Sequence, residues 1–394
     1  MAASISLSPC YSTTANPLRT SGHSSESYVL SIASLPTQYA ASESVPGNKI
    51  NIFDKSTLRN IQALAGHKVA TTALRSINII GENKKSLVSS GKDGKVIIWD
   101  ERTNSYGITM TNDQRQPLLC FDVSPDGMTV AAGTKLRGAD AKIHYWDPRN
   151  PFVPLRTHSS THSDDITTLS FLPSTSSNLV LSGSSDGLIS VSNADEEDED
   201  EAVLHVANWG CSISQAGWIH EPIGQGGANV WAASDMETFS TWTNELDPLL
   251  NVDIRNPSVH SHGQTWTTDY LITCHTTSFQ PLSVFVGTNE GDAALITHPD
   301  LRDASASWLI HNQWSKGHVG IVRALLWDEE HNTLVTGGED AKINIWSGPG
   351  DSAADSDADA NGSAMETETD VSPRPMKRDM DWVAEGQEAK RAKK

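Results

Sequence analysis

The sequence predicts an all-β fold in which seven small antiparallel sheets form one closed ring, followed by a disordered C-terminal tail. The first observation is a repeated unit of two alternating apolar runs joined by a tight turn, as in LVSSGKDGKVIIWD (87–100) and LVTGGEDAKINIWS (334–347). The second is the regular spacing of the positions at which these units close, and the third is a change of composition after residue 350. One such unit cannot bury both faces of its sheet alone, so neighbouring units must stack on one another.

The closing positions divide the chain into seven units. The clearest units close on Trp-Asp pairs, at Trp99 and at Trp146, and the weaker units keep the pattern with a different closing residue. The seven closing residues are Phe53, Trp99, Trp146, Ser192, Trp242, Ile296 and Trp346. Successive positions lie 46 to 54 residues apart, which is close to the length of one propeller blade with longer loops. Residues 1–350 are therefore predicted to form a single seven-bladed β-propeller.

The last unit closes at Trp346 and lacks an outer strand of its own. Because an open sheet edge invites unwanted pairing, an earlier segment is expected to supply this strand. We expect it within residues 3–22, where Pro9 and Pro17 leave its register open. The alternative interpretation of this Ser-rich start is an organelle transit peptide, but Arg19 is its only basic residue.

The composition narrows the class of partner. The chain has 394 residues and a formal net charge of −20, which disfavours nucleic acid and anionic membranes and favours basic proteins. It contains no apolar run of about 18 residues that could span a membrane. Its four cysteines (Cys10, Cys120, Cys211 and Cys274) have no paired spacing, which indicates a reducing compartment without disulfides or a zinc knuckle. No cofactor is predicted.

The units resemble WD40 repeats, because Gly-His and Trp-Asp pairs bracket them at Gly66-His67 with Trp99-Asp100, and at Gly317-His318 with Trp346. The resemblance implies a buried polar network of His, Ser or Thr, Asp and Trp. Asp accepts hydrogen bonds, His donates and accepts, and Trp donates, so the set can satisfy itself. Carried over position by position, the network residues are His67, Ser89, Asp93, Trp99, Asp140, Trp146, His162, Ser182, Asp186, His318, Thr336, Asp340 and Trp346. We interpret them as structural, and predict no catalytic or metal-binding residue.

Four longer runs resemble the WD repeat-containing protein 89 family: AGTKLRGADAKIHYWDPR (132–149), THSDDIT (161–167), LSGSSDGLISV (181–191) and TGGEDAKINIW (336–346). The resemblance spans residues 28–347 and is weakest between residues 203 and 300. It implies a nuclear propeller, and the family brings no catalytic residues to transfer.

Two acidic segments are candidate contact surfaces for a basic partner. One follows the fourth closing position and consists of Asp195, Glu196, Glu197, Asp198, Glu199, Asp200 and Glu201. The other is the linker 351–370, predicted to be disordered, with seven acids and no basic residue. Both come after closing positions, so both are expected on the face opposite the Gly-His turns. A solvated loop without a partner is the alternative interpretation of each.

The final segment, residues 371–394, has the spacing of a bipartite nuclear localisation signal. Two cationic clusters on a flexible chain can reach two acidic grooves of an import receptor. The residues are Lys377, Arg378, Lys390, Arg391, Lys393 and Lys394. The alternative is a basic tail without a receptor.

Together these features predict a non-enzymatic scaffold in the nucleus, with the cytoplasm as a second location, that acts as a monomeric ring within a larger complex. The expected partner is a protein with a basic segment, such as a ribosomal protein, a histone or a chromatin factor. One alternative is a substrate-receptor adaptor of a ubiquitin ligase. Another is an esterase, because a few WD40 rings, diphthine methylesterase among them, hydrolyse esters; no nucleophile lies beside a free base outside the structural sets.

Overall fold

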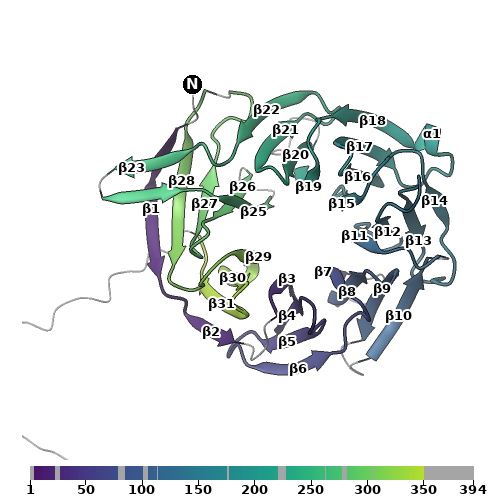
Figure 1. Cartoon of the computed structure of the whole chain (residues 1–394), viewed down its shortest axis with the longest axis horizontal. Coiled ribbons are helices and arrows are strands. Elements are labelled where there is room, and N and C mark those ends of the chain that lie inside the picture. Colours follow the sequence, from purple (N-terminus) through teal and green to yellow (C-terminus); the bar gives the residue numbers. More distant parts are fainter. Residues whose placement is uncertain are drawn as a thin grey trace, which may run out of the picture. The chain divides into compact units, whose positions relative to one another are not determined.

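The computed structural model describes residues 4–22, 27–78, 85–100, 105–112, 114–174, 177–220, 228–261, 263–276, 282–303 and 305–349. The chain divides into two units, residues 1–352 and 353–394, and only the first contains described residues. Within this first unit, seven sheets follow one another around a ring (Figure 1). The predicted seven-bladed all-β propeller is confirmed.

Each blade is an antiparallel sheet that runs from an inner strand to an outer strand. Blade 1 consists of β3 (Val29–Ser34), β4 (Gln38–Glu43), β5 (Ile50–Asp54) and β6 (Asn60–Leu64). Blade 2 consists of β7 (Thr71–Asn78), β8 (Lys85–Gly91), β9 (Lys95–Asp100) and β10 (Ser105–Thr111). Blade 3 consists of β11 (Leu118–Val123), β12 (Val130–Thr134), β13 (Ile143–Trp146) and β14 (Arg156–His158). Blade 4 consists of β15 (Ile166–Phe171), β16 (Leu179–Ser184), β17 (Leu188–Asn193) and β18 (Val203–Asn208). Blade 5 consists of β19 (Ile213–Ile219), β20 (Asn229–Ser234), β21 (Thr238–Trp242) and β22 (Pro248–Asp253).

The last two blades take strands from both ends of the ring sequence. Blade 6 consists of β25 (Tyr270–His275), β26 (Ser283–Gly287), β27 (Ala293–Thr297) and β28 (Trp308–Ser315), and blade 7 of β29 (Val322–Asp328), β30 (Thr333–Gly338) and β31 (Lys342–Ser347). A separate hairpin, β23 (Ser258–Ser261) with β24 (Gln264–Thr267), lies in the link between blades 5 and 6. Two short helical turns, α1 (Glu199–Ala202) and η1 (Glu329–His331), complete the described elements.

All seven predicted closing residues occupy the same place in their blades. Each pairs with a residue near the start of the second strand, in the pairs Tyr39–Phe53, Leu87–Trp99, Val130–Trp146, Val180–Ser192, Val230–Trp242, Val284–Ile296 and Leu334–Trp346. The repeat read from the sequence is therefore the repeat of the fold.

The core of the ring lies between the blades. Buried apolar side chains of the described residues form seven clusters, and each cluster joins two neighbouring blades. Between blades 2 and 3, for example, Val88 and Val96 pack with Phe121 and Val130. Burial removes roughly 25 cal/mol of unfavourable hydration per Å² of apolar surface, so each blade depends on both neighbours for its stability.

The N-terminal segment closes the ring with two strands. The strand β2 (Arg19–Gly22) pairs antiparallel with β31 and forms the outer strand of blade 7. The strand β1 (Ile5–Ala15) pairs with β28 instead, in parallel, and adds a fifth strand to blade 6. The segment 3–22, expected to serve only the last blade, therefore serves two blades (Figure 1).

The loops define two faces of the ring. The turns between second and third strands, together with the segments that enter each first strand, form what we call the top face. The links between first and second strands, and between third and fourth strands, form the bottom face. No described helix is long and apolar enough to cross a membrane.

Asp328 joins blades 7 and 1 at the bottom face. Its carboxylate accepts hydrogen bonds from Lys55 Nζ at 2.6 Å, Tyr39 Oη at 3.0 Å and Ser34 Oγ at 3.3 Å. Burial raises the pKa of Asp328, but the hydrogen bonds from Lys55, His331 and Tyr39, together with the charge of Lys55, outweigh it, and the pKa falls to about 2. This contact crosses the junction between the first and the last blade of the chain.

Replacing Asp328 by Ala should lower the free energy of unfolding by about 3 kcal/mol, because it leaves the nearly buried Lys55 ammonium without a counter-charge. Urea denaturation followed by tryptophan fluorescence measures the change. The matched control is Glu330→Ala, two residues away and exposed, which should change stability by less than about 0.5 kcal/mol. Equal losses in the two variants would contradict the assigned role of Asp328.

Candidate protein-interaction site

Blade 2 contains a complete polar network below the top face. His67 Nδ1 lies 2.8 Å from Asp93 Oδ1, and His67 Nε2 lies 2.9 Å from Ser89 Oγ. The Trp99 indole donates to Ser89 Oγ at 2.9 Å. A carboxylate only accepts, so Nδ1 donates to Asp93, and in the neutral ring Nε2 accepts from the Ser89 hydroxyl. The four side chains therefore satisfy one another.

Blade 7 repeats this network with Thr in place of Ser. His318 lies 3.0 Å from Asp340 and 2.8 Å from Thr336, and Trp346 donates to Thr336 at 2.9 Å. Burial raises the pKa of Asp340, but the hydrogen bond and charge of His318, together with the backbone N–H groups of Val319 and Lys342, outweigh it, and the pKa falls to about 2. The carboxylate is thus held ionised as an acceptor.

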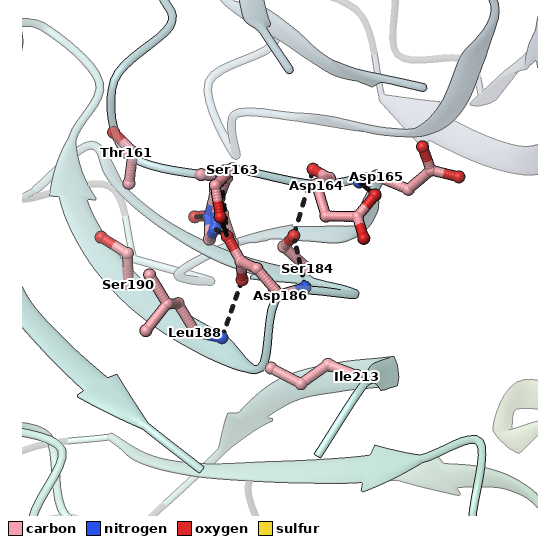
Figure 2. Close-up of polar contacts among 12 residues, drawn as sticks. Thr161, Ser163, Asp164, Asp165, Ser184, Asp186, Leu188, Ser190 and Ile213 are labelled. Carbon is pink, nitrogen blue, oxygen red and sulfur yellow. Dashed lines mark hydrogen bonds and ion pairs between the residues drawn. The ribbon is translucent and has the colours of Figure 1, made fainter. Parts of the chain in front are cut away.

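Blade 4 has part of the network: it lacks the Trp, and its His–Asp contact is longer than those of blades 2 and 7. His162 Nε2 lies 2.8 Å from Ser182 Oγ, and His162 Nδ1 lies 3.4 Å from Asp186 Oδ2. Figure 2 shows Asp186 at the tight turn, where it accepts from the backbone N–H of Leu188 at 2.8 Å and of Ser163 at 2.7 Å. The carboxylate therefore holds the turn to the segment that enters the blade.

Blade 3 does not form the expected network, so the prediction for Asp140 and Trp146 is wrong. The register explains why: Ala132 occupies the place that Ser89 has in blade 2, and no hydroxyl is available to Trp146. The Trp146 indole N–H has no hydrogen-bond partner among the described residues. Asp140 is exposed and lies 3.7 Å from Lys142.

The buried side chain of Gln116 holds the blade 3 turn instead. Its amide nitrogen donates to the backbone oxygen of Lys135 at 2.6 Å and lies 3.2 Å from Thr134 Oγ1 and from the Asp140 backbone oxygen. The signals that would have found this arrangement are the lack of a His before the third unit and the Ala at position 132.

The Ser-His contacts of the networks have a structural geometry. Ser89 and Ser182 are buried and lie inside blades 2 and 4. Ser89 also accepts from an indole, and each Asp also binds backbone N–H groups of its own turn region. A nucleophile must reach its substrate, so these hydroxyls are placed to stabilise turns.

The acidic segment 195–201 is folded onto the rim of the ring. Asp198 caps the one-turn helix α1, which lies at the outer edge between β14 and β18 (Figure 1). Glu199 accepts hydrogen bonds from the backbone N–H groups of Ser159, Ser160 and Thr161 and from the Thr161 hydroxyl, at 2.6–2.8 Å. One of the seven predicted contact residues is therefore used to anchor the loop between blades 3 and 4.

The segment begins at the bottom face and continues along the rim. Asp195 accepts from Asn178, which lies in a bottom-face link, at 2.8 Å, and Arg156 Nη2 lies 4.0 Å from Asp195. Four further acidic residues of the segment are exposed: Glu197, Asp198, Asp200 and Glu201. The acidic linker 351–370 lies outside the described residues, so its expected position on the bottom face stays a prediction.

Exposed apolar residues adjoin the acidic segment, and the sequence analysis missed them. Phe152 is 84 % exposed, and Val153 and Leu155 are also exposed, in the loop that leads to Arg156. On β18, which follows α1 directly, Leu204 and Val206 are exposed as well. The only available signal was the run PFVPL (151–155), which has no polar residue. We call Phe152, Val153, Leu155 and the segment 195–201 the rim site.

Three stretches match the WD40 repeat family, described as "WD domain, G-beta repeat": residues 58–100, 152–191 and 311–347. They contain the His, hydroxyl and Asp residues of blades 2, 4 and 7, the three blades in which the polar network forms. The chain is a seven-bladed β-propeller that contains WD40 repeats. WD40 propellers generally act as protein-interaction scaffolds.

Two relatives that match most of this chain support the resemblance to WD repeat-containing protein 89. The WD40 propeller is 27% identical over 328 residues to the "WD repeat-containing protein 89 homolog" of Dictyostelium discoideum, across 81% of this chain and 82% of the relative. It is 28% identical over 309 residues to "Uncharacterized WD repeat-containing protein YNL035C" of Saccharomyces cerevisiae, across 76% and 73%.

A solved structure shows the fold alone. The computationally designed Ika8 protein matches with a TM-score of 0.56 and 18% identity, over 88% of this chain and all of the designed chain.

One group of side chains has the proximity of a metal site. Ligand atoms of Asp328, Glu330 and His331 lie within 4.8 Å of one another. However, Lys55 binds the Asp328 carboxylate at 2.6 Å, and both of its oxygens lie 3.2 Å from His331 Nδ1. A cation there would face the Lys55 ammonium, so the group does not fit a metal.

The six predicted import residues (Lys377 to Lys394) lie outside the described residues.

Asp340→Ala should lower the free energy of unfolding by about 1–3 kcal/mol, because His318 and the Val319 N–H lose a buried acceptor. Asp140→Ala, at the corresponding turn of blade 3, should change it by less than about 0.5 kcal/mol. Urea denaturation of the two variants measures the difference. A loss at Asp140 as large as that at Asp340 would refute the register argument.

Proposed function

We propose that this propeller is a nuclear, non-enzymatic scaffold that binds a basic and amphipathic segment of a protein partner at the rim site. The observation that carries the proposal is that the acidic segment of blade 4 contacts the residues that directly follow an exposed apolar loop of blade 3. Arg156, which lies next to Leu155, approaches Asp195, and Glu199 binds the loop that follows β14. The two parts of the rim site are therefore held together by the fold.

The charges of the rim site are available to a partner. Four of its exposed acids, Glu197, Asp198, Asp200 and Glu201, form no ion pair with a described residue; Arg156 is the cation that approaches the segment, through Asp195. Like charges this close repel one another, and a cationic segment would relieve the repulsion. Charged groups at a rim accelerate association and select the sign of the partner.

The apolar loop can contribute binding affinity that the charges alone do not provide. Exposed ion pairs contribute only about 0.2–1 kcal/mol each, whereas large buried side chains dominate the affinity of most interfaces. Phe152 is exposed and projects from a loop fixed to the ring, so it can be covered without ordering a flexible chain. A partner would place apolar residues over Phe152, Val153 and Leu155 and its Lys or Arg residues over α1. Ribosomal proteins, histones and chromatin factors are the proposed clients.

Affinity purification from nuclear extract with mass spectrometry tests the rim site. The variant Glu197→Lys/Glu201→Lys and the variant Phe152→Ser should each lose basic partners that the native chain retains. The control Glu245→Lys/Glu330→Lys makes the same change of charge at exposed positions on the bottom face of blades 5 and 7, and should retain them. Recovery of no basic partner, or capture that does not weaken with added salt, would refute the proposal.

Nuclear import through residues 371–394 requires both cationic clusters. Replacing Lys377 and Arg378 by Ala, or Lys390 and Arg391 by Ala, should each shift a fluorescent fusion of the whole chain from the nucleus toward the cytoplasm. Arg374→Ala, outside both clusters, is the control and should leave the distribution unchanged. Unchanged nuclear accumulation after loss of both clusters would contradict this assignment.

A further inference from the structure

The top face of blades 2 and 3 carries a surface of the opposite charge. Lys68, Lys92, Arg115, Lys135 and Arg137 are all exposed, on loops that lie at this face; we call these five residues the cationic patch. None of them pairs with a carboxylate among the described residues. Three described acids nearby are already engaged: Asp93 by His67, Asp140 by Lys142, and Asp165 by the Leu136 N–H. In a chain with a net charge of −20, such a concentration of unpaired cations is unexpected.

Backbone contacts connect the loops of the cationic patch into one surface. The Lys92 N–H donates to the Ala70 oxygen at 2.9 Å, which fixes the turn of blade 2 beside Lys68 and Val69. The Asn112 N–H donates to the Gly94 oxygen at 3.3 Å, which brings the same turn against the loop that enters blade 3. The Lys135 N–H donates to the Pro117 oxygen at 2.8 Å. Backbone hydrogen bonds therefore connect the loops that carry the patch, from Lys68 to Lys135.

The fold holds this surface rigidly. Gly94 has a φ of +75°, and a Cβ there would lie 2.7 Å from the Arg115 Cα, so the two loops approach as closely as glycine allows. Arg115 itself has a φ of 48°, a left-handed conformation that is unfavourable for a residue with a side chain. Gln116 and the bond from Arg137 Nη1 to the Gln114 oxygen at 3.3 Å fix the remaining loop. The backbone positions that carry the cations are therefore set by the fold before a ligand binds.

We propose that the cationic patch binds a short acidic segment of a second protein partner. The sign of the patch selects carboxylates, and Val69, exposed between Lys68 and the turn of blade 2, offers an apolar contact. The neighbouring blade limits the length of the ligand, because Asp165 accepts from the Leu136 N–H at 2.7 Å and so places acidic residues at the border of the patch. A long polyanion such as a nucleic acid would run into this acidic border and into the field of the whole chain.

This site is separate from the rim site and does not depend on the proposed function. The cationic patch lies at the top of blades 2 and 3 and attracts acidic ligands, whereas the rim site attracts basic ones. Each can fail experimentally without the other.

Fluorescence anisotropy with the purified full-length chain tests the proposal. The probe is a fluorescein-labelled peptide of Glu residues with one central Leu, and the same peptide with Lys in place of Glu reports binding to acidic surfaces. The native chain should bind the Glu probe, with an affinity that falls as salt is added. Lys92→Glu/Lys135→Glu should weaken this binding by about tenfold or more, because each reversal replaces an attraction by a repulsion.

The matched control is Arg59→Glu/Lys85→Glu, which changes the net charge equally at the bottom face of blades 1 and 2. It should alter the affinity for the Glu probe by less than about twofold. Circular dichroism confirms that each variant is folded, and Lys68→Gln provides a milder second variant that should weaken binding in the same direction. The proposal is overturned if the native chain does not bind the Glu probe, if the control loses as much affinity as the patch variant, or if a single-stranded DNA of matched charge binds more tightly than the peptide.

Discussion

The contact between neighbouring blades is the interaction on which the rest of this structure depends. No blade has a core of its own, since every apolar cluster among the described residues takes side chains from two blades. An open row of such sheets would expose one face at each end. Closure of the ring removes both exposed faces at once, so the junction between blades 7 and 1 stabilises all the others.

The chain meets this constraint with three different contacts at the closing region. Val335 and Ile343 pack with Val29 and Tyr39 in the cluster between blades 7 and 1. The strand β2 then completes blade 7 from the other end of the ring sequence, and Asp328 bridges the bottom of the junction. An extra strand, β1, covers the edge of β28 in blade 6. The N-terminal segment thus covers two adjacent sheet edges that would otherwise be open.

The polar networks are a second, partial layer of stabilisation. They form in blades 2, 4 and 7, whereas the register position of Ser89 holds Ala or Val in the other four, at Ala41, Ala132, Ala232 and Val286. A turn without the network needs another support, and blade 3 uses Gln116. This mixture explains why the WD40 family description matches three stretches while the geometry repeats seven times.

The sequence predicted best those features that depend on a local pattern of residues. The seven closing positions follow from alternation and spacing, and all seven occupy equivalent positions in their blades. The role of β1 was not predictable, because its apolar alternation is limited to Ile5 and Leu7 before Pro9, and its partner is about 300 residues away in the chain. Glu199 looked like its six acidic neighbours, and only the folded loop at Ser159 distinguishes it. The rim site likewise joins residues from two blades.

Net charge also proved a poor guide to local surface. A value of −20 suggested one kind of partner, yet the top of blades 2 and 3 is cationic while the rim of blades 3 and 4 is acidic. At physiological salt, exposed charges act over about 8 Å, so surfaces on different parts of a rigid ring attract ligands independently. A ring that binds two partners of opposite charge raises the local concentration of one near the other without contact between the two sites. Such an arrangement requires a rigid scaffold and no catalytic residue. Seven blades that depend on one another for their stability provide this rigidity.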